Sequence, residues 1–164
     1  MLLDQSGEIE DHWPLLADGN AVPNAGYALV PLARLDEARD QDGVYLGAQV
    51  PNDADPETLS QHFGRLGLIS VDFPSFSDGR GFSIAARVRD LGFTGRMRAE
   101  GPVIADQFGY LLSCGFDEVS VPDDVAIRQP AEQWLAQLDR ISLSYQRGRS
   151  GRTSVLDQRI ASAG

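Results

Sequence analysis

A regular alternation of short apolar runs and amphipathic segments over residues 66–121 constrains the fold more than any other feature. It opens with Leu66–Phe73, LGLISVDF, a near-continuous apolar strand of the kind expected when both faces of a sheet are covered. A segment with helical periodicity and a terminal glycine follows, and the pattern then repeats. We expect helices at 78–91 and 103–114, and strands at 95–100 and 116–121.

The flanking residues continue this pattern. We expect strands at 27–31, 43–50 and 141–145, and helices at 32–39, 55–66 and 130–138. The alternation of strands and helices predicts an α/β domain with a mainly parallel sheet and right-handed crossovers. Because the strand-helix units are short, a partial barrel-like arrangement is the alternative.

The chain length of 164 residues suits one domain with a substantial core. We expect this single α/β domain to span residues 1–146. Its first part is polar and rich in turn-forming residues, which predicts an irregular N-terminal segment at 1–26. Residues 147–164, RGRSGRTSVLDQRIASAG, predict a mobile C-terminal tail.

The charged residues exclude several function classes. All 14 positively charged residues are arginine, so the chain has no lysine for a Schiff base or a phosphate-binding loop. The 24 acidic residues give a formal net charge of −10, which would repel nucleic acid and anionic lipid, so we expect neither as a partner. The N-terminus lacks the pattern of a signal peptide and the apolar runs are too short to span a bilayer, which indicates a cytoplasmic protein.

The potential metal ligands are few. Cys114 is the single cysteine, which excludes an internal disulfide and a cysteine metal site. His12 and His62 are the two histidines, and neither has a second ligand at a typical spacing. The sequence also has no GxGxxG and no phosphate-loop pattern. We therefore expect no metal and no cofactor.

The first candidate site follows the apolar strand, at the point where α/β domains bind ligands. Asp78, Gly79, Arg80 and Gly81 lie at a predicted helix N-terminus, where backbone N–H groups and an arginine fork suit a small oxyanion. In the alternative interpretation, Asp78 is a helix cap, the glycines form a tight turn and Arg80 is solvated.

The second candidate is the strand at 95–100. Arg96, Arg98 and Glu100 share one face of it because side chains alternate along a strand. Three charges on one face indicate either an edge strand or a face that lines a polar cleft, and edge strands are the commoner case. Arg98 and Glu100 lie nearer the end where a ligand would bind, whereas Arg96 is the more structural member.

The third candidate is the start of the next helix. Asp106 and Gln107 lie there, and Asp106 could pair with Arg80 or Arg98 across the strand ends. Such a pair is more often structural than catalytic. Asp72, Asp78 and Asp106 could supply a pair of carboxylates for acid–base chemistry, which is a weak signal because aspartate is common in this chain.

Several motifs in this central region resemble one bacterial family. They are FPxFxDGRG at 73–81, GxxRAxG at 95–101, Asp106-Gln107, and CGFD at 114–117. The chain resembles, over about residues 27–146, the family called domain of unknown function nine-three-four. Its members are often labelled oxidoreductases involved in sulfite reduction, because they are encoded beside sulfite reductase. The resemblance brings no reaction, catalytic residue or cofactor.

These observations lead to three functional hypotheses. The first is a non-catalytic accessory protein of assimilatory sulfite reduction that binds sulfite reductase or its electron donor, and a small oxyanion. The second is a small enzyme of sulfur assimilation that acts on an anionic substrate through the Arg80, Arg98, Asp78 and Asp106 cluster. The third is an interaction module whose tail docks a partner.

Overall fold

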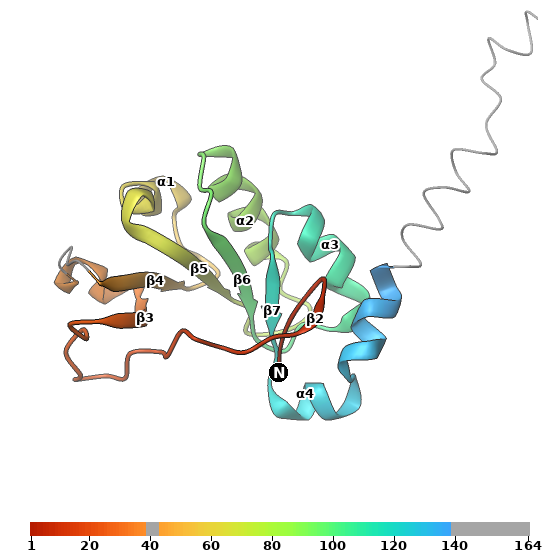
Figure 1. The fold of residues 1–164 in the computed structure, drawn as a ribbon. Coiled ribbons are helices and arrows are strands. Elements are labelled where there is room, and N and C mark those ends of the chain that lie inside the picture. Colours follow the sequence, from red (N-terminus) through yellow and green to blue (C-terminus); the bar gives the residue numbers. More distant parts are fainter. Residues whose placement is uncertain (39–42, 139–164) are drawn as a thin grey trace, which may run out of the picture.

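The computed structural model describes residues 1–38 and 43–138. The predicted strand at 141–145 and the predicted tail at 147–164 lie outside these residues. The described residues form one open sheet of seven strands with helices packed on it (Figure 1). The α/β class with a mainly parallel sheet is therefore confirmed, and the sheet is not closed into a barrel.

The strands occur in the spatial order β2-β1-β7-β6-β5-β4-β3. They are Leu2–Asp4 (β1), Gly7–Glu8 (β2), Gly26–Pro31 (β3), Val44–Val50 (β4), Leu66–Asp72 (β5), Arg96–Glu100 (β6) and Glu118–Ser120 (β7). The α-helices are Pro56–Ser60 (α1), Arg80–Asp90 (α2), Phe108–Ser113 (α3) and Asp123–Arg128 (α4), and residues 131–138 are also helical. Three 3₁₀ turns are Leu32–Glu37 (η1), Phe63–Arg65 (η2) and Ala105–Gln107 (η3).

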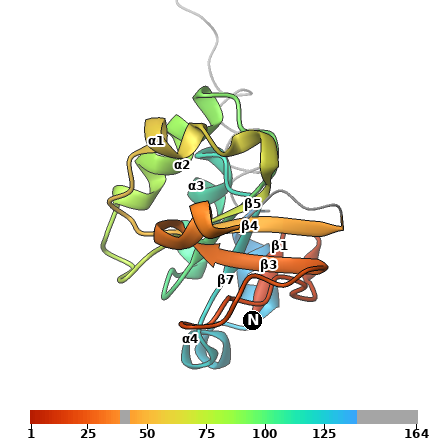
Figure 2. The ribbon, with the colours of Figure 1, turned by 90° about the vertical axis from the view of Figure 1, so that its left-hand side faces the viewer.

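Strands β3 to β7 are parallel, and each lies beside the next strand in the chain. When successive parallel strands are added in one direction, right-handed crossovers place every connecting helix on the same face. Figures 1 and 2 show α1, α2 and α3 together on one side of the sheet. The opposite face is therefore left without these helices.

The helical face holds the hydrophobic core. Met97 and Ala99 of β6 alternate toward this face and are fully buried, as is Val71 of β5. Trp134, from residues 131–138, is buried against Phe108 with 5.7 Å between ring centroids. Its indole N–H donates to the Gln129 carbonyl at 3.0 Å, so its polar group is satisfied inside the core.

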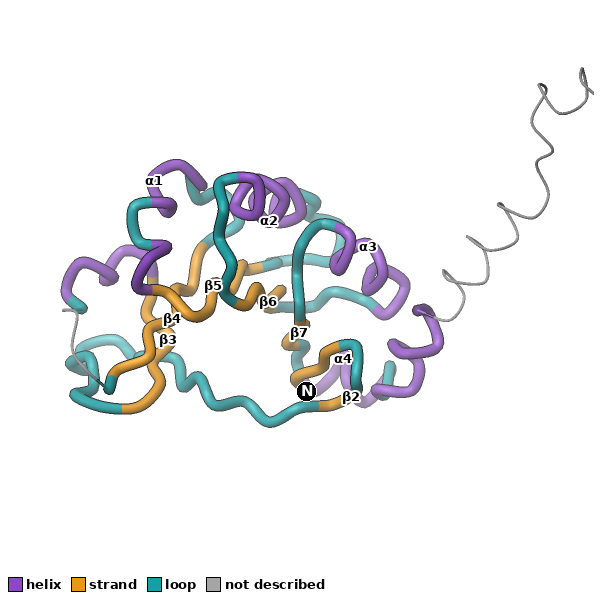
Figure 3. The backbone as a smooth tube through the Cα atoms, turned by 45° about the horizontal axis from the view of Figure 1, so that its top comes forward, coloured by secondary structure: helices purple, strands orange, loops and turns teal. Residues whose placement is uncertain are grey.

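The opposite face is crossed by residues 9–17, which we call the strap. The strap runs from β1 to β3: Ile9 N–H donates to the Leu2 carbonyl at one end, and Leu16 N–H donates to the Leu29 carbonyl at the other. Between these points Trp13 covers Gly47 of β4 and Gly67 of β5, where any added Cβ would lie 3.1 Å from the indole. Figure 3 shows this connection as a loop that passes along the sheet from the N-terminal strands to β3.

The structure corrects one expectation and decides between the alternatives of another. Segment 1–26 is not wholly irregular, because β1 pairs antiparallel with β7 and β2 pairs with β1. The strand with three charges is β6, which is central because β5 and β7 flank it, so of the two alternatives the polar cleft is the one that the structure has. Both faces of β5 are covered, as expected, by helices on one side and by the strap on the other.

The helix predictions differ mainly at the ends. Helix α2 begins at Arg80 with Gly79 as its N-cap, so Asp78 is not the capping residue. The predicted helices at 55–66 and 103–114 are each divided into a 3₁₀ turn and a short α-helix. Helix α4 was not predicted. None of the helices in the described ranges has the length and apolar character that a membrane span requires.

Candidate functional site

The polar face of the sheet and the strap enclose a pocket of about 350 Å³, which we call the strap pocket. Strand residues Gln49, Arg98 and Glu100 form part of its wall. The rest of the lining comes from Leu29 and from the strap residues Asp11, His12, Trp13, Pro14 and Leu15. Its volume lies in the range of small-ligand sites.

The parallel register places polar side chains in rows across this face. Gln49, Ser70, Arg98 and Glu118 are cross-strand neighbours on β4, β5, β6 and β7. Two residues further along three of these strands, Asp72, Glu100 and Ser120 form a second row. The second row lies at the carboxyl ends of the strands, where open α/β sheets place their ligands.

Arg98 is the centre of the first row and is only 2% exposed. Its Nη1 and Nη2 donate to the Asp11 carboxylate at 3.0 and 2.9 Å, and its Nε donates to Glu118 at 2.8 Å. Burial by itself lowers the pKa of Arg98, but the hydrogen bonds to Asp11 and Glu118 outweigh it and leave that pKa above its ordinary value. Arg98 is thus a fully engaged counter-ion for two carboxylates.

Arg96 extends this network toward the N-terminal strands. It donates to Glu118 at 2.6 Å and lies 3.5 Å from the Asp4 carboxylate of β1. Glu118 is buried, and both Arg96 and Arg98 form ion pairs with it. The sequence interpretation of Arg96 as a structural residue agrees with these contacts.

Glu100 and Asp72 occupy the second row and are adjacent in the β5–β6 register. Burial raises the pKa of Glu100, although a hydrogen bond from Ser120 at 2.8 Å and the charge of Arg98 oppose the shift. Burial also raises the pKa of Asp72, which accepts a hydrogen bond from Gln49 at 3.1 Å. Both carboxyl groups are partly desolvated, and no arginine of the described residues forms an ion pair with either.

Ser70 lies between Gln49 and Arg98 in the register and is fully buried. Its hydroxyl has no hydrogen-bond partner within the described part of the chain. Strand alternation directs this hydroxyl to the same face as Gln49 and Arg98, both of which line the strap pocket. An unsatisfied buried hydroxyl is costly, so it marks a place where a ligand or water would be stabilised.

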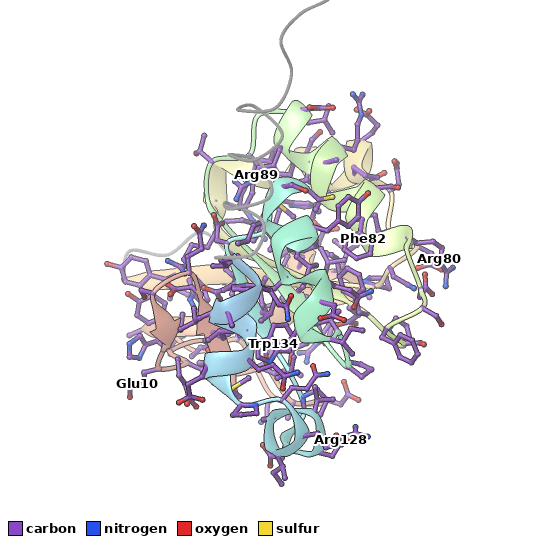
Figure 4. The ribbon with its side chains drawn as sticks, turned by 90° about the vertical axis from the view of Figure 1, so that its right-hand side faces the viewer. Glu10, Arg80, Phe82, Arg89, Arg128 and Trp134 are labelled. Atoms are coloured by element: carbon purple, nitrogen blue, oxygen red, sulfur yellow. The ribbon has the colours of Figure 1, made fainter. Side chains whose placement is uncertain are left out.

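Arg80 belongs to a different part of the molecule. Its guanidinium donates to Asp78 at 3.1 and 2.7 Å, and Asn52 donates to the same carboxylate at 2.6 Å. These hydrogen bonds, that of Arg80 above all, lower the pKa of Asp78 to about 2. The Arg80 side chain is 62% exposed, and Figure 4 shows it on the opposite side of the molecule from Glu10, the strap neighbour of Asp11.

Two glycines of the shared motifs, Gly81 and Gly101, have steric roles. A Cβ on Gly81 would lie 2.5 Å from the Phe73 ring. Gly101, which ends the GxxRAxG motif, has φ +133°, and its Cβ would lie 2.1 Å from the Phe73 carbonyl oxygen. A Cβ on Gly79 would make only an ordinary contact, 3.9 Å from the Phe82 ring, and Gly79 serves as the N-cap of α2. Close packing around Phe73 therefore explains two of the glycines that the motifs share.

Asp106 and Gln107 lie in η3. Gln107 accepts from the Ile104 N–H at 3.1 Å and donates to the Phe76 carbonyl at 2.7 Å, so it fastens two loops together. Asp106 forms no ion pair with Arg80 or Arg98, each of which has other carboxylate partners. The predicted cluster of Arg80, Arg98 and Asp106 is not formed.

Of the predicted site residues, Arg98 and Glu100 share the strap pocket, and Asp78, Gly79, Arg80 and Gly81 form a separate loop. Sequence reasoning missed the pocket residues Asp11, Trp13 and Gln49, and the buried partners Ser70 and Glu118. Ser70 and Asp72 carried a signal, because they alternate as polar positions within an otherwise apolar strand. No group of three or more His, Cys, Asp or Glu side chains that could hold a metal occurs among residues 1–38 and 43–138.

Comparisons with known proteins identify the family. No curated protein and no solved structure matches the chain. The sequence model of one family, described as a bacterial protein of unknown function (DUF934), matches residues 47–156. The match covers more than half of the chain, and it starts and ends later than the resemblance at 27–146. The chain is therefore a member of the bacterial DUF934 family.

Proposed function

We propose that the protein is a non-catalytic accessory protein of assimilatory sulfite reduction, which acts by binding sulfite reductase or its electron donor. The hydrogen bonds of Arg98 are the main support for a non-catalytic role. Its guanidinium is buried and already bound by Asp11 and Glu118. An arginine in this state stabilises the protein and has no donor pair left to clamp an anionic substrate.

The link to sulfite reduction is supported by the family resemblance and by the label that its members often carry. The formal net charge of −10 supports binding to a protein partner, because a strongly acidic surface steers association with a basic one. The alternative of an enzyme that acts on an anion would need Arg80 and Arg98 to converge, and they do not. Neither an anionic substrate nor a bound oxyanion is therefore part of the proposed function.

The proposal is tested by co-purification of the full chain with the sulfite reductase of the same organism. We expect specific association at low ionic strength that weakens as salt is added, since electrostatic association is screened. A deletion strain should grow poorly with sulfate as its sulfur source and normally with sulfide. No association, together with normal sulfite reduction in the deletion strain, would refute the proposal.

A further inference from the structure

We propose that the strap pocket binds a cationic group, a guanidinium or an ammonium, against Glu100 of its wall, with Asp72 beside Glu100 in the strand register. The ligand would contact residues of the pocket wall and their register neighbours Ser70 and Asp72, and its binding does not depend on the link to sulfite reduction. It also replaces the oxyanion expected from the sequence with a ligand of opposite charge.

The charge balance of the polar face is the first argument. Asp11, Glu118, Glu100 and Asp72 contribute four carboxyl groups to this face, and two arginines, Arg98 and Arg96, lie among them. The arginines donate hydrogen bonds directly to Asp11 and Glu118. Glu100 and Asp72 form no ion pair within residues 1–38 and 43–138, so a further positive charge would complement them.

The position of the two remaining carboxyl groups is the second argument. Asp72 and Glu100 are paired in the parallel register, so their backbones lie about 5 Å apart. A planar guanidinium or an ammonium can donate to two carboxylates at such a spacing. Burial raises the pKa of both groups, and the approach of a cation would reverse this shift.

The buried Ser70 hydroxyl is an independent observation that points to a ligand. It is enclosed on the same face, two residues before Asp72, and has no partner among the described residues. Its register neighbours Gln49 and Arg98 both line the pocket. Because a hydroxyl can accept a hydrogen bond, Ser70 can accept from an N–H group of a ligand that reaches past Glu100 and Asp72.

The strap supplies an aromatic wall for the same ligand. Trp13 lines the pocket and makes an edge contact with Tyr27 at 4.9 Å between ring centroids. Tyr27 in turn stacks on Tyr45 at 4.7 Å, so the indole is held in place. An indole that lines the same pocket as a carboxylate is a favourable environment for a cation.

The test uses N-acetyl-arginine amide as the cationic probe and N-acetyl-citrulline amide as its neutral control of the same shape. Both are titrated into the isotope-labelled full chain and followed by NMR. We expect saturable shifts of the Trp13 indole signal with the arginine probe alone, while the buried Trp134 indole stays unchanged. Free L-arginine and an arginine-containing peptide then distinguish a small-molecule ligand from the side chain of a protein partner.

The variant Glu100→Gln should weaken the binding of the arginine probe at least about tenfold, because it removes one charge and can still accept from Ser120. Asp72→Asn is the second variant, in case the first does not fold. Asp124→Asn, at an exposed ion pair with Arg128, is the control and should bind as the wild type does. The proposal is overturned if no cationic probe binds saturably, if citrulline binds equally well, or if both pocket variants retain full affinity.

Discussion

The carboxylate of Asp11 receives two hydrogen bonds from the buried guanidinium of Arg98, a residue 87 positions later in the chain. This pair joins the strap to the central strand β6. It connects the strap, which crosses the polar face, with the strand whose charges lie at the centre of that face. The geometry makes Arg98 a structural residue on which the shape of the strap pocket depends.

Arg98→Met should destabilise the domain by about 3 kcal/mol or more, because it leaves Glu118 and Asp11 without their main counter-ion. Arg80→Met is the matched control and should destabilise the domain much less, since the Arg80 side chain is 62% exposed and its ion pair is screened by solvent. Urea unfolding of the two variants checks the difference. Equal stability losses would show that Arg98 does not have the structural role assigned to it.

Glu100→Gln should change the pH dependence of stability. Because the folded-state pKa of Glu100 is raised above its ordinary 4.5, the folded protein binds this proton more tightly than the unfolded chain. Ionisation of Glu100 therefore costs stability as the pH rises from 4.5 through the raised pKa, and glutamine avoids this cost. The variant should gain stability relative to the wild type between about pH 4 and pH 8. Denaturant unfolding of both proteins at about pH 4 and about pH 8 checks this. A difference between the midpoints of the variant and the wild type that is the same at the two pH values would contradict the prediction.

Gly101→Ala should be far more destabilising than Gly92→Ala. Both glycines have positive φ, +133° and +96°, so each substitution carries a backbone strain of about 1–2 kcal/mol. At Gly92 a Cβ would meet no atom within 4 Å, whereas at Gly101 it would collide with the Phe73 backbone. We expect an additional loss of about 1–3 kcal/mol at Gly101. Thermal unfolding of both variants measures it, and similar melting temperatures would show that the contact is not required.

Much of the fold follows from local patterns. The apolar run at β5, the alternation at β6 and the glycine after α2 are short-range signals, and the structure has elements at each of them. The N-cap of α1 is a further example, because Asp55 accepts from the Glu57 and Thr58 N–H groups as its position before Pro56 predicts. Local chemistry is sufficient wherever a few neighbouring residues determine the backbone.

The errors come from long-range pairing. The two N-terminal strands are only three and two residues long, and β1 is held by β7, more than 100 residues later. A strand this short has no periodicity to detect. The charges of β6 similarly left an edge strand and a polar cleft both open, because a central strand with arginine on one face requires a partner such as Asp11, which only the fold supplies.

The candidate site was predictable only in part. Arg98 and Glu100 could be selected because charged residues are unusual in a parallel strand. Their true neighbours, Asp11 and Glu118, lie far away in the chain, so the sequence interpretation chose the nearer Asp106. Arg80 was grouped with Arg98 because both lie where an α/β domain places ligands. In the structure, Arg98 lies on the polar face of the sheet, whereas Arg80 begins α2 on the helical side.

The central claim is that the Asp11–Arg98 pair holds the strap on the sheet, and amide hydrogen exchange in Asp11→Asn tests it most directly. Asparagine keeps the oxygen that accepts from the Trp13 N–H but loses the charge that binds Arg98. The Leu16 and Leu29 amides, which join the strap to β3, should exchange at least about tenfold faster in the variant. The Asp117 amide, which bonds to the Met97 carbonyl, should be unchanged. Unchanged exchange at Leu16 and Leu29 would contradict the account.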